Sequence, residues 1–217
     1  LNIQCEMVWR GAKRLAVFDL DSTLIAEETI DELAAEVGAA DAVARITRRA
    51  MNGEVNFRDA LAERVALLRG MRVDRLESVK RRVRITPGAH RLIAALRRMG
   101  CETAVVSGGF DFLANHIRDE LNLHHAYANR LEVGPDDRLT GRTIGDIVDG
   151  EFKASTLRRL ADARGLAKHE ILAVGDGSND IPMMRLAGLG VAFNAKPIVQ
   201  QSATTRVNQE SLASILY

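Results

Sequence analysis

Three short apolar runs along the chain each end in polar or glycine-rich residues. The runs cover residues 14–18, 102–106 and 170–174, and their length and composition suit buried strands. They stop at an acidic cluster that begins with Asp19, at residues 107–109 and at residues 175–177. The pattern predicts three parallel strands whose carboxyl ends carry polar loops.

Amphipathic helical patterns separate these runs. Between Gly88 and Met99 the apolar residues recur at helical spacing on one face, and Gly100 supplies a stop signal before the second run. Strands that alternate with such helices predict an α/β fold, a Rossmann-like doubly wound parallel sheet. In that fold the functional site lies in the crevice at the carboxyl ends of the strands, where the three polar loops fall.

Residues 26–86 interrupt this alternation, because they show helical periodicity without a strand signal. The periodic segments are 29–37, 41–51, 57–68 and 73–83. They predict a small helical cap, inserted after the first strand into a core made of residues 1–25 and 87–217, and placed over the crevice as a lid. Residues 127–147 contain two alternating runs around a Gly-Pro-Asp-Asp turn, which predicts a β-hairpin flap.

Composition and charge do not change the predicted fold, but they exclude several classes of function. The 217 residues suffice for one catalytic unit, and 30 basic against 29 acidic residues give a net charge of +1, which does not suit a general nucleic-acid binder. The local basic excess in residues 42–91 is typical of solvated helix faces, and no apolar run is long enough for a membrane span. Cys5 and Cys101 form no metal or disulfide pattern, so we expect a cytoplasmic protein. Because the first residue is Leu1, we also expect a longer natural chain.

Four aspartates carry the strongest chemical signal. Asp19 and Asp21 are two residues apart, so on extended backbone their carboxylates would point to one side. Asp176 and Asp180 follow the third predicted strand, and adjacent strands would bring all four together. Such a cluster repels itself without a cation, and oxygen ligands without His or Cys favour Mg²⁺.

Two further segments suit an anionic substrate. Ser107-Gly108 offers a hydroxyl and accessible backbone N–H groups for phosphate oxygens, and Lys153 supplies a positive charge at a helix start. Each of these features also has a purely structural interpretation. Lys153 alone would be an ion-pair partner, the Ser-Gly-Gly segment alone would be a turn, and Asp176 and Asp180 would be helix caps. Their joint placement at three strand ends favours phosphoryl transfer instead.

The ordered motifs resemble those of the haloacid dehalogenase superfamily, and in detail its phosphoserine phosphatase family. The matching segments are Asp19-Leu-Asp-Ser-Thr-Leu24, Ser107-Gly-Gly109, Lys153 and Gly175-Asp-Gly-Ser-Asn-Asp180, with flanks at Glu28, Asn129-Arg-Leu131, Ile147–Lys153 and Gly188–Pro197. The resemblance implies hydrolysis of O-phospho-L-serine to L-serine and phosphate in serine biosynthesis. It covers nearly the whole chain.

The resemblance also implies roles for single residues. Asp19 would attack phosphorus and form an aspartyl phosphate, and Asp21 would act as the acid and then as the base. Mg²⁺ would be held by the Asp19 carboxylate, the Asp21 carbonyl and Asp176, with Asp180 in support. Ser107, Gly108, Lys153 and Asn179 would hold the phosphate.

The serine head group would meet the cap. The resemblance places its carboxyl and amino groups against Arg64 and Glu28, beneath Met51 and Phe57. The planar guanidinium of an arginine suits a carboxylate. Without the resemblance, Arg64 would be interpreted as a solvated helix residue, and Met51 and Phe57 as packing residues of the insert. Glu28 would then be an acidic residue that stabilises a helix start.

Alternatives stay open at this point. The aspartyl phosphate would serve equally a phosphotransferase that passes the group to an alcohol such as homoserine, or a broader phosphomonoesterase. A phosphoserine-binding module without turnover would have no use for Asp21 as a proton donor. Only 6 Phe, 2 Tyr and 1 Trp are present for stacking on nucleic acid, and no motif supports that partner. A homodimer is compatible with the sequence.

Overall fold

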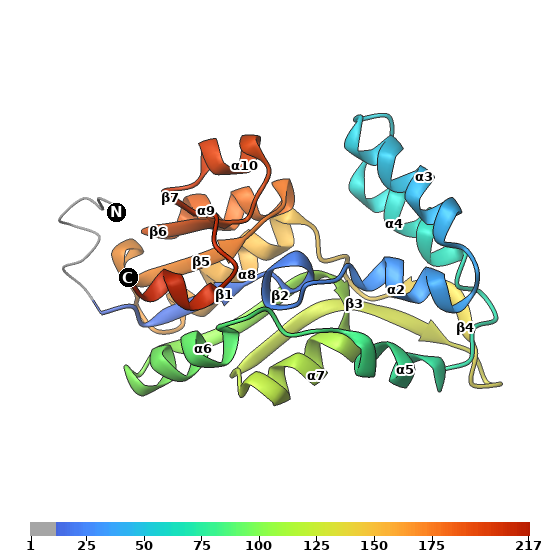
Figure 1. Cartoon of the computed structure of the whole chain (residues 1–217), viewed down its shortest axis with the longest axis horizontal. Helices are drawn as coiled ribbons and strands as arrows, with labels where there is room; N and C mark the ends of the chain where they lie inside the picture. Colours follow the sequence, from blue (N-terminus) through green and yellow to red (C-terminus); the bar gives the residue numbers. More distant parts are fainter. Residues whose placement is uncertain (1–11) are drawn as a thin grey trace.

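A computed structural model describes residues 12–217, so Cys5 and the start of the predicted core lie outside the described residues. Its centre is a seven-stranded sheet in the order β4-β3-β2-β1-β5-β6-β7 (Figure 1). The strands are β1 (Leu15–Phe18), β2 (Glu102–Phe110), β3 (His125–Val133), β4 (Leu139–Ile144), β5 (Ile171–Gly175), β6 (Leu189–Phe193) and β7 (Thr205–Val207). All neighbours pair in parallel except β3 and β4, which are antiparallel.

Both faces of the sheet are covered, which confirms the doubly wound α/β prediction. Alternate residues of β1 face opposite sides, so Leu15 and Val17 pack with α8 (Gly150–Asp162) and α9 (Ile181–Leu186). Ala16 and Phe18 pack with α6 (Ala89–Arg98) and α7 (Asp111–Leu121) on the other face. The short α10 (Pro197–Ser202) and the 3₁₀ segment η4 (Leu212–Leu216) complete the two layers.

The insert after β1 is helical, as predicted. It contains α2 (Thr29–Glu36), α3 (Ala40–Met51), α4 (Phe57–Ala66) and α5 (Arg75–Arg82), and α3 and α4 project beyond the sheet in Figure 1. Its two connections to the core lie side by side: Ile25 and Ile85 form an antiparallel bridge, and Ala26 N donates to Arg84 O over 3.0 Å. A domain boundary at residues 26 and 86 stays a prediction, and this narrow crossing is consistent with it.

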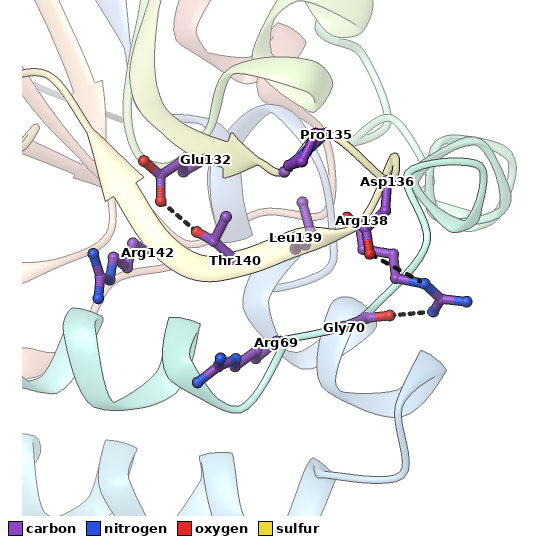
Figure 2. A pocket seen from close by; sticks show the side chains of 10 residues that line it. Arg69, Gly70, Glu132, Pro135, Asp136, Arg138, Leu139, Thr140 and Arg142 are labelled. Atoms are coloured by element: carbon purple, nitrogen blue, oxygen red, sulfur yellow. Dashed lines mark hydrogen bonds and ion pairs between the residues drawn. The ribbon is translucent and has the colours of Figure 1, made fainter.

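A second contact joins the insert to the predicted hairpin, which β3 and β4 form. Gly70 N donates to Leu139 O and Leu139 N to Met71 O, each over 2.8 Å, and Arg138 Nη1 donates to Gly70 O over 2.7 Å. Figure 2 shows this junction, where a cavity of about 380 Å³ lies between the hairpin and Arg69-Gly70. These hydrogen bonds tie the base of the cap to the core, and the α3–α4 end lies farthest from them in Figure 1.

The strand pattern differs from the prediction in two ways. Residues 107–109, expected as a loop, lie inside β2, because its parallel pairing with β3 continues to Phe110 across an irregularity. The sequence pattern also did not predict β6 and β7; Gly190 interrupts the apolar run of β6, and β7 has only three residues. Between residues 12 and 217, no helix is long and apolar enough to cross a membrane.

Candidate active site

The chain makes a tight turn directly after β1. Asp19 is extended and its Oδ1 accepts from Leu20 N over 2.7 Å, after which the irregular turn η1 (Leu20–Leu24) is closed by Ile25 N donating to Leu20 O over 3.0 Å. Ser22 has φ +56°, in the left-handed region. Asp19 and Asp21 each have extended backbone angles, with ψ of 163° and 135°, as predicted, although the chain turns directly after them. Their carboxylates nevertheless meet different partners.

Lys153 joins two of the predicted aspartates. Its Nζ lies 2.8 Å from Asp19 Oδ1 and 2.7 Å from Asp180 Oδ1, and the lysine side chain is fully buried. Asp149 caps α8 by accepting from Phe152 N over 3.0 Å, and this places Lys153 in the first turn of the helix. Burial alone would lower the pKa of Lys153, but the Asp180 and Asp19 carboxylates raise it above its ordinary value, so the ammonium stays charged.

Asp19, Asp176 and Asp180 form a compact acidic cluster. One carboxylate oxygen from each lies within 4.8 Å of the others. Asp180 Oδ2 also accepts from Gly177 N over 2.9 Å, which fixes its carboxylate against the loop after β5. The geometry brings together three of the four aspartates predicted as ligands, and the Asp21 carboxylate is not part of the cluster.

The electrostatics of this cluster fit a divalent cation. Burial, followed by the Asp180 carboxylate, raises the pKa of Asp19 well above its ordinary value, although Lys153 opposes the shift. The same two causes raise the pKa of Asp176 to about 7. When the three carboxylates are ionised, they and the one ammonium leave two negative charges, which a divalent metal ion bound to oxygen ligands would balance.

Asp21 lies in a separate part of the site. The Thr29 hydroxyl donates to Asp21 Oδ1, and Thr29 begins α2 beside Glu28. Burial, followed by the Glu28 carboxylate, raises the pKa of Asp21 to about 7, against the hydrogen bonds from Thr29. A carboxyl group with this pKa can give and take a proton near neutral pH.

Ser107, Gly108 and Gly109 bring β2 against Asp21. Ser107 is buried, and its Oγ accepts from Gly109 N over 2.8 Å. A Cβ added to Gly109 would lie 2.8 Å from Asp21 Oδ2 and 3.0 Å from Ser107 Oγ, so glycine is required for this approach. The side chains of Asp21 and Ser107 therefore both lie next to Gly109.

The predicted head-group residues come from the cap. Arg64 is half-buried, and its Nε donates to Ala60 O over 3.1 Å. Burial lowers the pKa of Arg64, while the nearby Glu28, Asp31 and Asp21 carboxylates raise it. Glu28 Oε1 accepts from Ser22 Oγ over 2.8 Å. The structure therefore places Arg64 and Glu28 on the Asp21 side of the site.

Two apolar residues of the cap lie toward the core, at different depths. Phe57 packs over Gly108, where an added Cβ would lie 3.0 Å from Phe57 Cζ. Met51 is 60% exposed and contacts the Lys196 ammonium from the loop after β6, at 3.8 Å from Sδ to Nζ. Met51 therefore lies at the solvent-exposed rim of the site, whereas Phe57 lies deeper, over Gly108.

Several known proteins are similar to this chain in sequence and in fold. A family model described as haloacid dehalogenase-like hydrolase matches residues 16–185. A probable phosphoserine phosphatase of Schizosaccharomyces pombe is 48% identical, and the match covers 100% of this chain and 74% of that protein. A phosphoserine phosphatase of Streptomyces coelicolor is 49% identical, and the match covers 96% of this chain and 50% of that protein. The solved structure of a phospho-aspartyl intermediate analogue of phosphoserine phosphatase is 42% identical, with a TM-score of 0.88 over 95% of this chain and 98% of that one.

The chain belongs to the phosphoserine phosphatase family of the haloacid dehalogenase-like hydrolases. It spans half the length of the Streptomyces coelicolor relative, so it corresponds to part of that larger protein. The family resemblance inferred from the four motifs is thereby confirmed.

Within this family site, sequence reasoning missed the residues that support the acids. Thr23 Oγ1 donates to Asp176 Oδ1 over 3.2 Å, and the Thr29 hydroxyl donates to Asp21 Oδ1. Of these two threonines, only Thr23 had a signal in the sequence, because it lies within the first motif. Asn179, predicted to hold phosphate, is half-buried and lies over Gly177, where an added Cβ would be 2.3 Å from Asn179 Oδ1. None of the predicted site residues lines the cavity of Figure 2, which is separate from this site.

Proposed function

We propose that this chain, alone or as part of a larger protein, hydrolyses O-phospho-L-serine to L-serine and phosphate. The observation that carries the proposal is the placement of Asp19 against both Lys153 and the acidic cluster, at the carboxyl end of the central strand. The solved relative described as a phospho-aspartyl intermediate analogue supports an aspartyl phosphate as the intermediate. The residues gathered there would supply the parts that phosphoryl transfer requires, namely a nucleophile, an acid, cation ligands and phosphate ligands.

In the first step an Asp19 carboxylate oxygen attacks phosphorus, and the bond between phosphorus and the serine oxygen breaks. Asp21 gives its proton to the departing oxygen, for which its pKa of about 7 is suited. In the second step Asp21 takes a proton from water, the water oxygen attacks phosphorus, and the bond to Asp19 breaks to release phosphate. Asp19 and Asp21 thus return to their starting states.

The phosphate is proposed to lie between β2 and α8. Since Ser107 Oγ already accepts from Gly109 N, its hydroxyl hydrogen can donate to a phosphate oxygen. Gly108 N, Lys153 and Asn179 would supply the other contacts. Mg²⁺, held by the Asp19 and Asp176 carboxylates and the Asp21 carbonyl with Asp180 in support, would balance the charge of the phosphate and the acids.

The serine head group is proposed to bind under the cap. Arg64 would meet its carboxylate and Glu28 its ammonium, since a zwitterion needs one charge of each sign. Phe57, which lies over Gly108, and Met51 at the rim would limit the space beside the side chain. A larger phosphomonoester would then bind less well.

The test measures phosphate release from phosphoserine and a panel of phosphomonoesters, with and without Mg²⁺, beside homoserine as an acceptor. We expect Mg²⁺-dependent release from phosphoserine that Asp19→Asn abolishes, because the amide is not a nucleophile. Retained turnover in Asp19→Asn would exclude the proposed intermediate. Phosphohomoserine formation would show a phosphotransferase, and equal rates over the panel would show a broad phosphomonoesterase.

We propose the cytoplasm as the site of this activity. The proposed substrate is a small metabolite, and the free, buried thiol of Cys101 would stay reduced in that compartment. The basic cap surface would be solvated rather than bound to nucleic acid. A homodimer stays a prediction, which light scattering of the purified chain would test.

A further inference from the structure

The strand β2 contains an irregularity beside the proposed phosphate site. Ser107 pairs with Ala128 of β3, and the next pair is Phe110 with Asn129. Two residues of β2, Gly108 and Gly109, therefore stand opposite no residue of β3, and their peptide groups need other partners.

Side chains supply those partners. Asn129 is fully buried, and its Nδ2 donates to Gly108 O over 2.7 Å. On the other side of the same peptide group, Gly109 N donates to Ser107 Oγ over 2.8 Å. The peptide plane between the two glycines is thus held at both its carbonyl and its N–H, and this fixes the direction of the neighbouring Ser107 hydroxyl.

The other end of the Asn129 amide reaches a different element. Its Oδ1 accepts from Val148 N over 2.8 Å. Val148 precedes Asp149, whose side chain caps α8 and whose carbonyl accepts from Lys153 N over 2.9 Å. One buried amide therefore links the glycine segment of β2 to the start of the helix that carries Lys153.

We propose that Asn129 is a positioning residue for phosphoryl transfer, holding the Ser107-Gly108 segment and the start of α8 in register around the phosphate. This inference rests on the proposed function, since it assigns both segments to phosphate binding. Asn129 does not touch the substrate and acts through Gly108 and Val148. The amide is suited to this task because it offers a donor and an acceptor on opposite sides of one rigid plane.

Two substitutions of Asn129 distinguish its hydrogen bond to Gly108 O from its hydrogen bond with Val148 N. Asn129→Leu has a similar volume and removes both hydrogen bonds. Asn129→Asp keeps the shape and the acceptor for Val148 N, but in its ionised form it faces Gly108 O without a donor. Because a small displacement of the phosphate from its nucleophile slows reaction strongly, we expect kcat to fall about 10²-fold in Asn129→Leu. In both variants we expect inorganic phosphate to bind about tenfold more weakly, since its ligands are misplaced.

The experiment compares both variants with the wild-type chain and with Leu121→Ala. Leu121 is buried at the end of α7, before the amino end of β3, so its truncation lowers stability without reaching the site. Each protein is assayed at a temperature where its circular dichroism equals that of the wild type. The measurements are kcat and KM for phosphoserine, the inhibition constant of inorganic phosphate, and protection by phosphate against thermal unfolding.

Loss of phosphate affinity and of kcat in the Asn129 variants, with both values unchanged in Leu121→Ala, supports the proposal. Variants that lose only thermal stability, as Leu121→Ala does, overturn it and leave Asn129 a core residue. The phosphate protection requires no turnover, so a wild-type chain that binds phosphate but fails to hydrolyse phosphoserine would refute the proposed function, and the role of Asn129 in holding the phosphate-binding segments would then be decided by the phosphate-binding measurements.

Discussion

Arg58 and Asp149 join the cap to the core across the site. Arg58 Nε and Nη2 donate to the same Asp149 Oδ2, over 2.9 and 2.6 Å. Arg58 follows Phe57 in the first turn of α4, while Asp149 caps the helix of Lys153. The first turn of α4 thus contacts both proposed phosphate-binding segments, Phe57 at Gly108 and Arg58 at the start of α8.

Arg58→Gln tests whether this ion pair, which joins the cap to the core, favours substrate binding. Arg58 is 64% exposed, so the pair contributes at most about 1 kcal/mol, which corresponds to an equilibrium change of up to about fivefold. We expect KM for phosphoserine to rise within that range while kcat changes little. High salt should raise the KM of the wild type toward that of the variant, because screening weakens the same pair.

Arg49→Gln is the matched control. Arg49 pairs with Glu63 over 2.8 Å between α3 and α4, and this exposed ion pair lies within the cap. Its loss should leave KM and its salt dependence unchanged. Equal effects of the two substitutions would mean that net cap charge, not the contact with Asp149, sets substrate affinity.

The periodic parts of the fold were readable from the sequence. The predicted helix 57–68 corresponds to α4 at Phe57–Ala66, since its apolar spacing and the Asn56 cap both act locally. The extension of β2 through Ser107–Gly109 was not readable. Glycines indicate a turn by themselves, and here pairing with β3 and the Asn129 side chain, which lies 21 residues from Gly108 along the chain, decide the conformation.

The same distinction applies to the site. Motif spacing predicted that Asp19, Asp176, Asp180 and Lys153 would meet, because each follows or precedes an element of the central sheet. It did not predict the different surroundings of Asp19, which contacts Lys153, and of Asp21, which accepts a hydrogen bond from Thr29 in the cap. Nor could it pair Arg58 with Asp149, which are 91 residues apart and belong to the cap and the core.

Lys153→Met removes the cation that separates two buried carboxylates. Breaking a buried charge pair on one side typically costs about 3–5 kcal/mol, so we expect a loss of that size in the free energy of unfolding without metal, together with loss of turnover. Urea titration and phosphate release measure the two. The exposed Lys168→Met is the control and should change neither.

A double substitution checks the origin of that loss. In Lys153→Met with Asp180→Asn, one of the two stranded charges is also gone. The double variant should therefore be more stable than the sum of the single effects predicts. Strict additivity would show that the Lys153–Asp180 contact over 2.7 Å does not couple the two residues energetically.

The metal-free protein should lose stability as the pH rises. The pKa of Asp176 is raised from an ordinary 3.8 to about 7, so the folded state binds the proton more tightly than the unfolded state. This contribution to stability is fully present below about pH 4 and is lost as the pH rises through about 7. Added Mg²⁺ competes with that proton, so its stabilising effect should be larger at about pH 8 than at about pH 5.5. Thermal unfolding with and without Mg²⁺ at both pH values measures this, and equal protection at both would contradict a site built from Asp176.

Gly175→Ala should damage the acidic cluster through sterics alone. A Cβ at this position would lie 2.4 Å from both Asp180 Cγ and Oδ2, and Asp180 cannot withdraw because Lys153 and Gly177 N hold its two oxygens. We expect a loss of about 1–3 kcal/mol in stability and a large loss of Mg²⁺-dependent activity, since Asp180 is displaced. Gly165→Ala is the control: its φ of +60° makes alanine unfavourable by about 1 kcal/mol, but an added Cβ there has open space. It should lower the melting temperature and leave turnover unchanged, whereas full activity in Gly175→Ala would show that the Asp180 carboxylate need not occupy this position.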